Sequence, residues 1–190
     1  MEYKWTISKE FHWEMGHRVW SQKLEHANLS ISTDCACKHL HGHSYVLKVF
    51  LSANELDQSS MVTDFKNLNF MKSFIDDHLD HKFMIDVNDP NIEIITGVAP
   101  NVIRSRFSRD ENFINLGGIW SAGSINSDDL NNLEFIQLHR DSFVLVNFVP
   151  TSENICRYLK NYAQERIGSV ATVTATELWE TKKSHCRYSD

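Results

Sequence analysis

The feature that most constrains the fold is an alternation of apolar and polar side chains in two separate segments. In residues 2–12, Trp5, Ile7 and Phe11 alternate with polar neighbours, and residues 43–52 have a similar pattern. A period of two places the apolar side chains on one face of a β-strand, which another layer must cover. We therefore expect two half-buried strands that pair with each other.

Two further segments have helical spacing. Residues 65–79 carry apolar side chains on one face and follow Asp64, which can cap a helix. Residues 152–167 carry a similar stripe between Thr151 and Gly168, which are typical of a helix start and a helix end. We expect a helix in each segment.

The end of the chain returns to strand character. Residues 170–181 are rich in β-branched side chains, and a short last strand fits residues 185–189. Between the helices, residues 88–142 have no clear periodicity, and residues 143–149 are apolar enough for an extra strand. The order favours an α+β fold with an antiparallel sheet.

Composition limits the classes of function. The 190 residues are 42% hydrophobic, which is enough for one core, and the formal charge of −6 argues against a nucleic-acid groove. No stretch approaches the roughly 20 apolar residues of a membrane span, and the N-terminus lacks the apolar core of a signal peptide. The four cysteines are too few and too uneven for a disulfide scaffold. We expect a cytoplasmic protein with free thiols.

Three histidines have the pattern of a catalytic zinc site. His41 and His43 are separated by one glycine at the start of a strand, so both imidazoles project from one face. His17, just past the first strand, can supply a third nitrogen. Three protein ligands with one open position are typical of catalytic zinc. The alternative is a structural zinc site formed by Cys35, Cys37, His39 and His41, although these four lie within seven residues.

Six motifs follow one another from about residue 10 to residue 181: EFHWEMGHRV, CKHLHGHSYVLKV, MVTDF, LDHKFM, PTSEN and ELWET. In this order they resemble the motifs of the 6-pyruvoyltetrahydropterin synthase / 6-carboxytetrahydropterin synthase family. The resemblance implies the tunnelling fold: a four-stranded antiparallel sheet with two helices on one face, whose trimers pair into hexamers. It implies one domain over residues 1–190, with a long insertion at about 89–149, before the second helix.

The resemblance also implies roles for individual residues. It makes His17, His41 and His43 the zinc ligands and Cys37 the catalytic thiol. It also implies that Asp80 and His81 take part in catalysis. Glu180 would take part in catalysis and bind the pterin through its carboxylate. Thr151 and Ser152 would line the pterin site.

Some of these roles have alternatives in the residues themselves. Asp80 can instead cap a turn, and Glu180 can be an ordinary solvent-facing carboxylate. A second thiol, Cys35, lies close to Cys37. A cysteine acts as a base at neutral pH only where a nearby cation or metal favours its thiolate. Zinc and His81 can both supply such a charge.

The implied reaction is lyase chemistry on 7,8-dihydroneopterin triphosphate. The form CKHLHGH resembles the branch that makes 6-carboxytetrahydropterin for queuosine synthesis; the alternative branch makes 6-pyruvoyltetrahydropterin and releases triphosphate. A third alternative is an inactive pterin-binding or scaffold member of the fold. An acidic chain must gather its cations locally to bind a triphosphate, and Arg18, Lys38 and Lys82 lie near the motifs.

Overall fold

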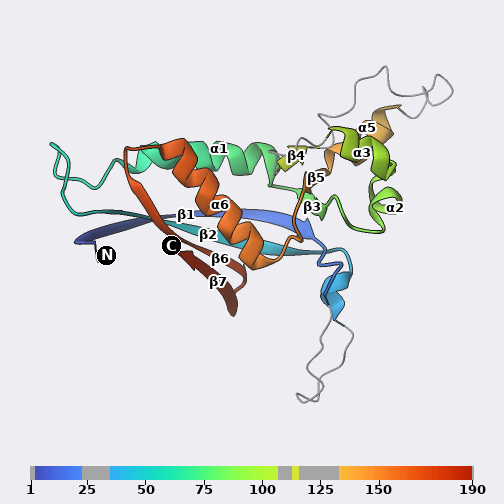
Figure 1. The fold of residues 1–190 in the computed structure, drawn as a ribbon, viewed down its shortest axis with the longest axis horizontal. Helices are drawn as coiled ribbons and strands as arrows, with labels where there is room; N and C mark the ends of the chain where they lie inside the picture. Colours follow the sequence, from blue (N-terminus) through green and yellow to red (C-terminus); the bar gives the residue numbers. More distant parts are fainter. Residues whose placement is uncertain (1–2, 23–34, 107–112, 116–132, 190) are drawn as a thin grey trace, which may run out of the picture. The chain divides into compact units, whose positions relative to one another are not determined.

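The structure is a computed structural model that describes residues 3–22, 35–106, 113–115 and 133–189 (Figure 1). It contains two compact units, and strands β1 and β2 each run through both. The first unit comprises Met1–Glu14, His43–Asp80 and Thr151–Asp190, and the second comprises Met15–Gly42 and His81–Pro150. Within the described ranges, no helix has the length and apolar character that a membrane crossing requires.

The first unit is a sheet covered by two helices. Its strands lie in the spatial order β1 (Trp5–His17), β2 (His41–Ala53), β6 (Thr172–Thr181) and β7 (Ser184–Ser189). The pairs β2/β6 and β6/β7 are antiparallel. The helices are α1 (Asn69–His78), which follows the 3-10 helix η3 (Phe65–Leu68), and α6 (Ser152–Ile167). Both helices lie on the same side of the strands in Figure 1.

The core of this unit follows from the alternation in the sequence. In β2, Tyr45, Leu47, Val49 and Leu51 are buried, while the residues between them are more exposed. Aromatic side chains join the two helices, because the rings of Phe74 in α1 and Tyr162 in α6 lie 4.2 Å apart. Full burial of a side chain of this size contributes about 1.5–3 kcal/mol to the stability of the fold. The packing of the helices on the sheet therefore stabilises this unit.

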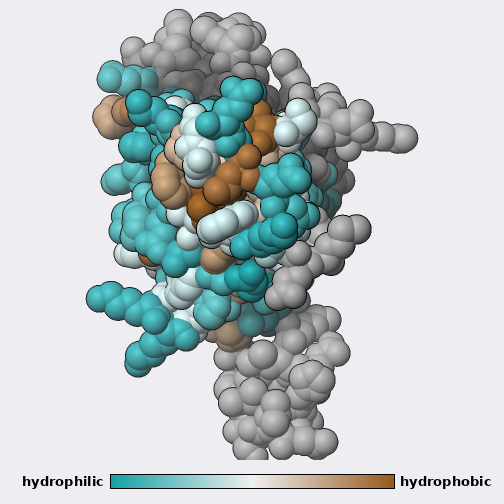
Figure 2. Space-filling view, turned by 90° about the vertical axis from the view of Figure 1, so that its left-hand side faces the viewer, coloured by the Kyte–Doolittle hydropathy of each residue, from teal (hydrophilic) through white to brown (hydrophobic). Residues whose placement is uncertain are grey.

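The face of the molecule drawn in Figure 2 is mostly hydrophilic. Figure 2 shows hydrophilic side chains around a limited apolar area on one face of the molecule. Large apolar side chains that are exposed in the first unit are Tyr3, Trp5, Met61, Phe65 and Val170. Individually exposed apolar residues are normal in a folded protein.

The second unit adds shorter strands and helices. Its elements are the 3-10 helix η2 (Ala36–Lys38), β3 (Lys82–Asp86), α2 (Ile92–Thr96), α3 (Pro100–Arg106), β4 (Phe113–Asn115), α5 (Leu133–Asp141) and β5 (Phe143–Val146). The end of β1 pairs in parallel with β3, where His17 faces Met84, and β3 pairs in parallel with β5. The pair β4/β5 is antiparallel.

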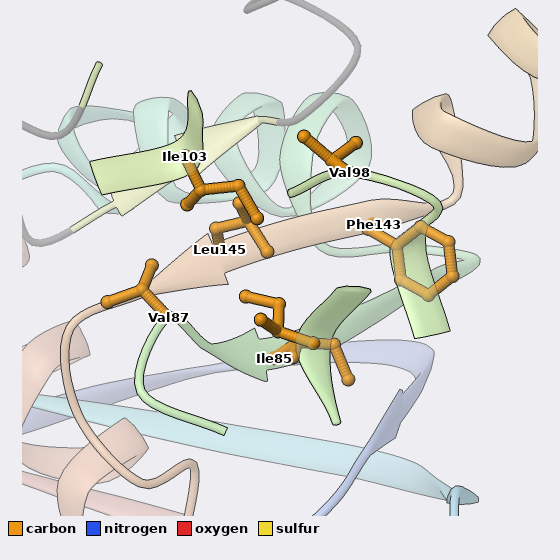
Figure 3. Close-up of a cluster of buried hydrophobic side chains, with 7 residues drawn as sticks. Ile85, Val87, Val98, Ile103, Phe143 and Leu145 are labelled. Carbon is orange, nitrogen blue, oxygen red and sulfur yellow. The ribbon is translucent and has the colours of Figure 1, made fainter. Parts of the chain in front are cut away.

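This unit has a hydrophobic cluster of its own (Figure 3). Ile85 from β3 and Leu145 from β5 lie at its centre, and Ile103 from α3 contributes from the helical side. The buried members are Ile85, Val87, Ile92, Val98, Ile103, Phe143 and Leu145. The segment without periodicity in the sequence therefore contains packed structure in its described part.

The second helix and the last strands agree with the sequence analysis. Helix α6 spans Ser152–Ile167, the Thr151 side chain accepts a hydrogen bond from the backbone N–H of Asn154, and Gly168 ends the helix with a φ of 59°. The predicted strands at 170–181, 185–189 and 143–149 correspond to β6, β7 and β5.

Two expectations were wrong in detail. The helix expected at 65–79 begins as the 3-10 helix η3, although Asp64 caps it by accepting from the N–H of Lys66. The sheet is not four-stranded and antiparallel; it is mixed, because β3 and β5 pair in parallel beside the end of β1. Parallel strands are short continuous apolar runs, which carry no alternation to reveal them.

Candidate metal centre and active site

His17 ends strand β1 and is almost fully buried, with 1% of its surface exposed. The preceding residue must be small, because a Cβ on Gly16 would lie 2.1 Å from the ring of Phe83. The Nδ1 atom of His17 lies 2.6 Å from the carbonyl oxygen of Pro150. A carbonyl oxygen can only accept, so Nδ1 carries the proton and Nε2 is the nitrogen whose lone pair can bind a metal.

His41 begins strand β2 and has the same arrangement. Its Nδ1 lies 2.8 Å from the carbonyl oxygen of His39, so this ring also keeps its proton on Nδ1. Gly42, next along β2, lies against the first strand: a Cβ there would be 3.3 Å from the carbonyl oxygen of Met15. The backbone is therefore close to β1 at this position.

The Nε2 atoms of His17 and His41 lie close together. The Nε2 atoms of His17 and His41 are 3.0 Å apart, and the ring centroids are 4.5 Å apart. With both Nδ1 atoms donating to carbonyls, two neutral imidazoles would bring two lone pairs together at this distance. A cation bound by both nitrogens removes that repulsion, and a carbonyl behind each ring is the usual support for a histidine ligand.

His43 follows His41 by two residues on β2, so its side chain leaves the strand on the same face. One ligand atom from each of His17, His41 and His43 lies within 4.8 Å of the others. These three histidines can therefore hold a metal ion. Three nitrogen ligands suit zinc and leave a coordination position for a substrate.

The alternative cysteine site does not form. In the described ranges, the histidine triad is the only group of histidine, cysteine or acidic side chains that brings three ligand atoms this close together. Cys35 precedes η2 and Cys37 lies within it, both half-buried. The backbone N–H of Val19 donates to the carbonyl of Cys37 at 2.9 Å.

The two thiols of this turn are neighbours. Hydrogen bonds from the backbone and then the thiol of Cys37 lower the pKa of Cys35. The thiolate of Cys35 is therefore more accessible than that of an isolated cysteine, which the sequence analysis did not anticipate. A second cysteine two residues away was the signal that could have indicated such a pair.

The two residues of the Asp-His pair in the LDHKFM motif have different environments. Asp80 is half-buried, and its Oδ1 accepts from the backbone N–H of Glu14 at 3.0 Å. His81 is exposed and adopts a φ of 59°, a left-handed conformation that is uncommon outside glycine. Such backbone strain often accompanies functional residues.

Glu180 lies on β6 in the first unit and is half-buried rather than fully solvated. Burial and, second, the negative charge of Glu180 raise the pKa of the Tyr45 phenol. Tyr45 stacks on Trp13 with ring centroids 5.2 Å apart, and its ring meets that of His43 edge to face at 5.7 Å. Tyr45 thus contacts a candidate metal ligand and lies near Glu180.

Tyr45 was missed by the sequence analysis. The signal was present, because His43 and Tyr45 are two residues apart on one strand and must share a face. A pocket of about 460 Å³ in the first unit is lined by Ser44, Val46 and Lys48 of the same strand, together with Glu10, His12, Trp179, Thr181 and Lys182. Since these β2 residues alternate with His43 and Tyr45, the pocket opens on the other face.

The residues expected near the pterin lie at the start of α6. The hydroxyl oxygen of Thr151 accepts from Asn154 as the helix cap, and Ser152 contacts Glu153 at 3.5 Å. Both are half-buried. The Ser152 hydroxyl donates to the Glu153 carboxylate, whereas the Thr151 hydroxyl acts as an acceptor in its contact and can donate its hydrogen elsewhere.

Two of the three cations near the motifs are engaged in structural contacts. Arg18 donates to the carbonyl of Lys38 and to Asp89, and the Lys82 ammonium donates to the carbonyl of Asp141 at 2.5 Å. Lys38 contributes only its carbonyl oxygen to these contacts.

Relatives with known names cover the whole chain. The 6-carboxy-5,6,7,8-tetrahydropterin synthase of Aquifex aeolicus is 31% identical over 198 residues, covering 98% of this chain and 99% of the relative. A protein of the same name from Haemophilus influenzae is 26% identical over 189 residues, covering 97% of this chain and 98% of the relative.

Solved structures with a similar fold also cover nearly the whole chain. An uncharacterised protein from Wolinella succinogenes matches with a TM-score of 0.77 and 36% identity, covering 98% of both chains. The 6-pyruvoyl tetrahydropterin synthase of Caenorhabditis elegans matches with a TM-score of 0.54 and 19% identity, covering 100% of this chain and 99% of that one, which supports the fold alone. The family model of 6-pyruvoyl tetrahydropterin synthase matches residues 6–190. The chain therefore belongs to the 6-pyruvoyl tetrahydropterin synthase family.

Proposed function

We propose that this chain is a zinc-dependent 6-carboxytetrahydropterin synthase, a lyase that converts 7,8-dihydroneopterin triphosphate to 6-carboxy-5,6,7,8-tetrahydropterin in queuosine biosynthesis. The observation that carries the proposal is the pair of Nε2 atoms of His17 and His41, 3.0 Å apart with both Nδ1 atoms donating to carbonyls. The full-length relatives that bear this name support the choice of reaction.

The metal would be held by His17, His41 and His43. Zinc bound there supplies a Lewis acid that lowers the pKa of coordinated hydroxyl groups on the substrate side chain. The carbonyls of Pro150 and His39 keep the first two rings oriented and in the tautomer that binds metal.

The proton transfers fall to the thiol turn and the LDHKFM motif. Cys37 moves protons on the side-chain carbons, and His81 assists it as a second acid or base. Asp80, whose Oδ1 accepts from Glu14, positions the start of this motif. Cys35, with its lowered pKa, is the rival for the role of Cys37.

The pterin ring would be bound by Glu180. A carboxylate can accept two hydrogen bonds from a ring N–H and the neighbouring amine, and a charged acceptor strengthens both. The half-burial of Glu180 supports this role, because it reduces competition from water. Thr151 and Ser152 line the same site from the start of α6.

The assembly is proposed on the family resemblance. We infer a cytoplasmic homohexamer built from trimers, with one pterin-synthase domain and an inserted segment at about 89–149.

The test is mass analysis of the products after incubation of the zinc-loaded protein with 7,8-dihydroneopterin triphosphate. We expect 6-carboxy-5,6,7,8-tetrahydropterin, acetaldehyde and triphosphate. Accumulation of 6-pyruvoyltetrahydropterin without acetaldehyde would instead place the chain in the other branch of the family, since both branches release triphosphate. Retained pterin binding without any product would identify a binding protein. The Cys37→Ala variant is the matched control for chemistry that does not depend on the enzyme.

A further inference from the structure

Arg18, the residue after His17, has a guanidinium group that contacts three residues in two other segments of the second unit. Its Nε donates to the carbonyl of Lys38 at 2.6 Å, and its Nη1 donates to Oδ1 of Asp89 at 3.1 Å. With its amide oxygen facing the guanidinium, Asn91 accepts from Nη2 at 3.0 Å and from Nη1 at 3.2 Å. Only one of the five N–H donors is left without a partner among these contacts.

The ion pair inside this network is mostly withdrawn from solvent. The Asp89 side chain is 1% exposed and the Arg18 side chain is 15% exposed. Oδ1 of Asp89 also accepts from the N–H of Asn91 at 2.8 Å, whereas its Oδ2 is buried without a hydrogen-bond partner in the described part of the chain. Arg18 is therefore the group that compensates the charge of Asp89.

The contact to Lys38 fixes the turn that carries the thiols. The carbonyl of Cys37 accepts from the N–H of Val19, and the next carbonyl, that of Lys38, accepts from Arg18. Two successive residues after His17 thus hold two successive carbonyls of η2. The third residue, Trp20, donates from Nε1 to buried Asp86 at 2.9 Å, which anchors the same segment to the end of β3.

We propose that Arg18 is a positioning residue that sets the place of Cys37 relative to the substrate through the Lys38 carbonyl, with Asp89 and Asn91 orienting the guanidinium. This inference rests on the proposed catalytic role of Cys37. A guanidinium group is needed here, because its planar arrangement of N–H donors lets arginine donate in three fixed directions while it pairs with a carboxylate. The same engagement argues against Arg18 as a ligand of the substrate triphosphate.

The test compares Arg18→Lys with the parent protein, both in a Cys35→Ala background, where Cys37 is the remaining thiol of the turn. Lysine keeps the charge beside Asp89 but cannot reach the Lys38 carbonyl at the same time. We expect full zinc content, a KM within about twofold, and a kcat lower by about ten- to a hundredfold, as for a group displaced by about 1 Å. The rate at which iodoacetamide alkylates Cys37 should change several-fold.

Asp89→Asn should reproduce the loss of kcat, and Lys72→Gln is the matched control. Lys72 forms a pair of 2.6 Å with Asp76 on the surface of α1, and its loss should change neither kcat nor alkylation. An increased KM with unchanged kcat in Arg18→Lys would overturn the proposal and make Arg18 a substrate ligand. Loss of zinc would also overturn it, because Arg18 would then support His17 rather than the thiol turn.

The alkylation rate of Cys37 tests the positioning role of Arg18 independently of whether the protein catalyses the proposed reaction. If the parent protein forms no pterin product while Arg18→Lys still alters alkylation of Cys37 several-fold, the proposed reaction is wrong and the placement of the turn by Arg18 stands. If alkylation of Cys37 is the same in both proteins, Arg18 does not position the turn.

Discussion

Two ion pairs, one in each unit, differ in their burial. In the first unit, Lys72 and Asp76 pair on the surface, with side chains 70% and 48% exposed. In the second unit, Arg18 and Asp89 are 15% and 1% exposed and join segments 71 residues apart in the sequence. Both units bury polar side chains, but the buried carboxylates of the described residues, Asp86 and Asp89, both belong to the second unit. Most residues proposed for metal binding and proton transfer, His17, Cys37, His41 and His81, belong to the second unit as well.

The largest expected effect is on metal binding. His41→Ala removes one of two facing Nε2 atoms, so purified protein that carries about one zinc per chain should lose most of it and all measurable turnover. Elemental analysis measures this. His12→Ala, an exposed histidine on β1, should keep its zinc. A chelator should lower the melting temperature of the parent protein, because metal that binds only the folded state stabilises it.

The next effect is on chemistry alone. Cys37→Ala should keep zinc and pterin binding while turnover falls by about 10²–10⁴-fold, the usual loss for a positioned acid or base. Cys35→Ala should keep most activity. The reverse pattern in steady-state kinetics would transfer the role to Cys35, whose lowered pKa makes it the competing thiolate.

The contrast between the ion pairs can be measured as stability. Asp89→Asn leaves Arg18 without its counter-charge and should reduce the free energy of unfolding by about 3 kcal/mol, at the low end for a buried pair because Arg18 keeps some solvent contact. Lys72→Gln should change it by no more than about 0.5 kcal/mol. Urea denaturation of both variants decides the matter: equal effects would abolish the distinction between the two units.

The smallest functional effect is expected in the first unit. Glu180→Gln keeps the shape of the side chain but removes a charge, and a hydrogen bond to a charged group is worth about 1.5–3 kcal/mol. Pterin affinity, measured by calorimetry, should weaken by at least about tenfold with zinc content unchanged. Unchanged affinity would make Glu180 an ordinary carboxylate on the strand.

Structural elements marked by residues nearby in the sequence could be predicted, whereas contacts between residues far apart in the sequence could not. Helix α6 could be predicted because Thr151 and Gly168 mark its ends locally. Strand β3 could not, because five residues with three buried in succession show no alternation. The grouping of the three histidines could be proposed from their spacing and from the family motifs.

The contacts that orient those histidines could not be predicted. The carbonyl that sets the His17 tautomer comes from Pro150, 133 residues away, and the partner of Arg18 comes from Asp89. A backbone carbonyl has no residue type, so nothing in the sequence marks it as a partner. The contact of Tyr45 with His43 was also missed, but it could have been predicted, because residues two apart on a strand share a face.

The most direct test of the central claim, that His17, His41 and His43 bind zinc through nitrogen, is X-ray absorption spectroscopy of the zinc-loaded protein. We predict a four-coordinate first shell of nitrogen and oxygen atoms at about 2.0–2.1 Å, with the outer-shell scattering of imidazole rings. A sulfur atom at about 2.3 Å would contradict the account, because it would place Cys35 or Cys37 on the metal.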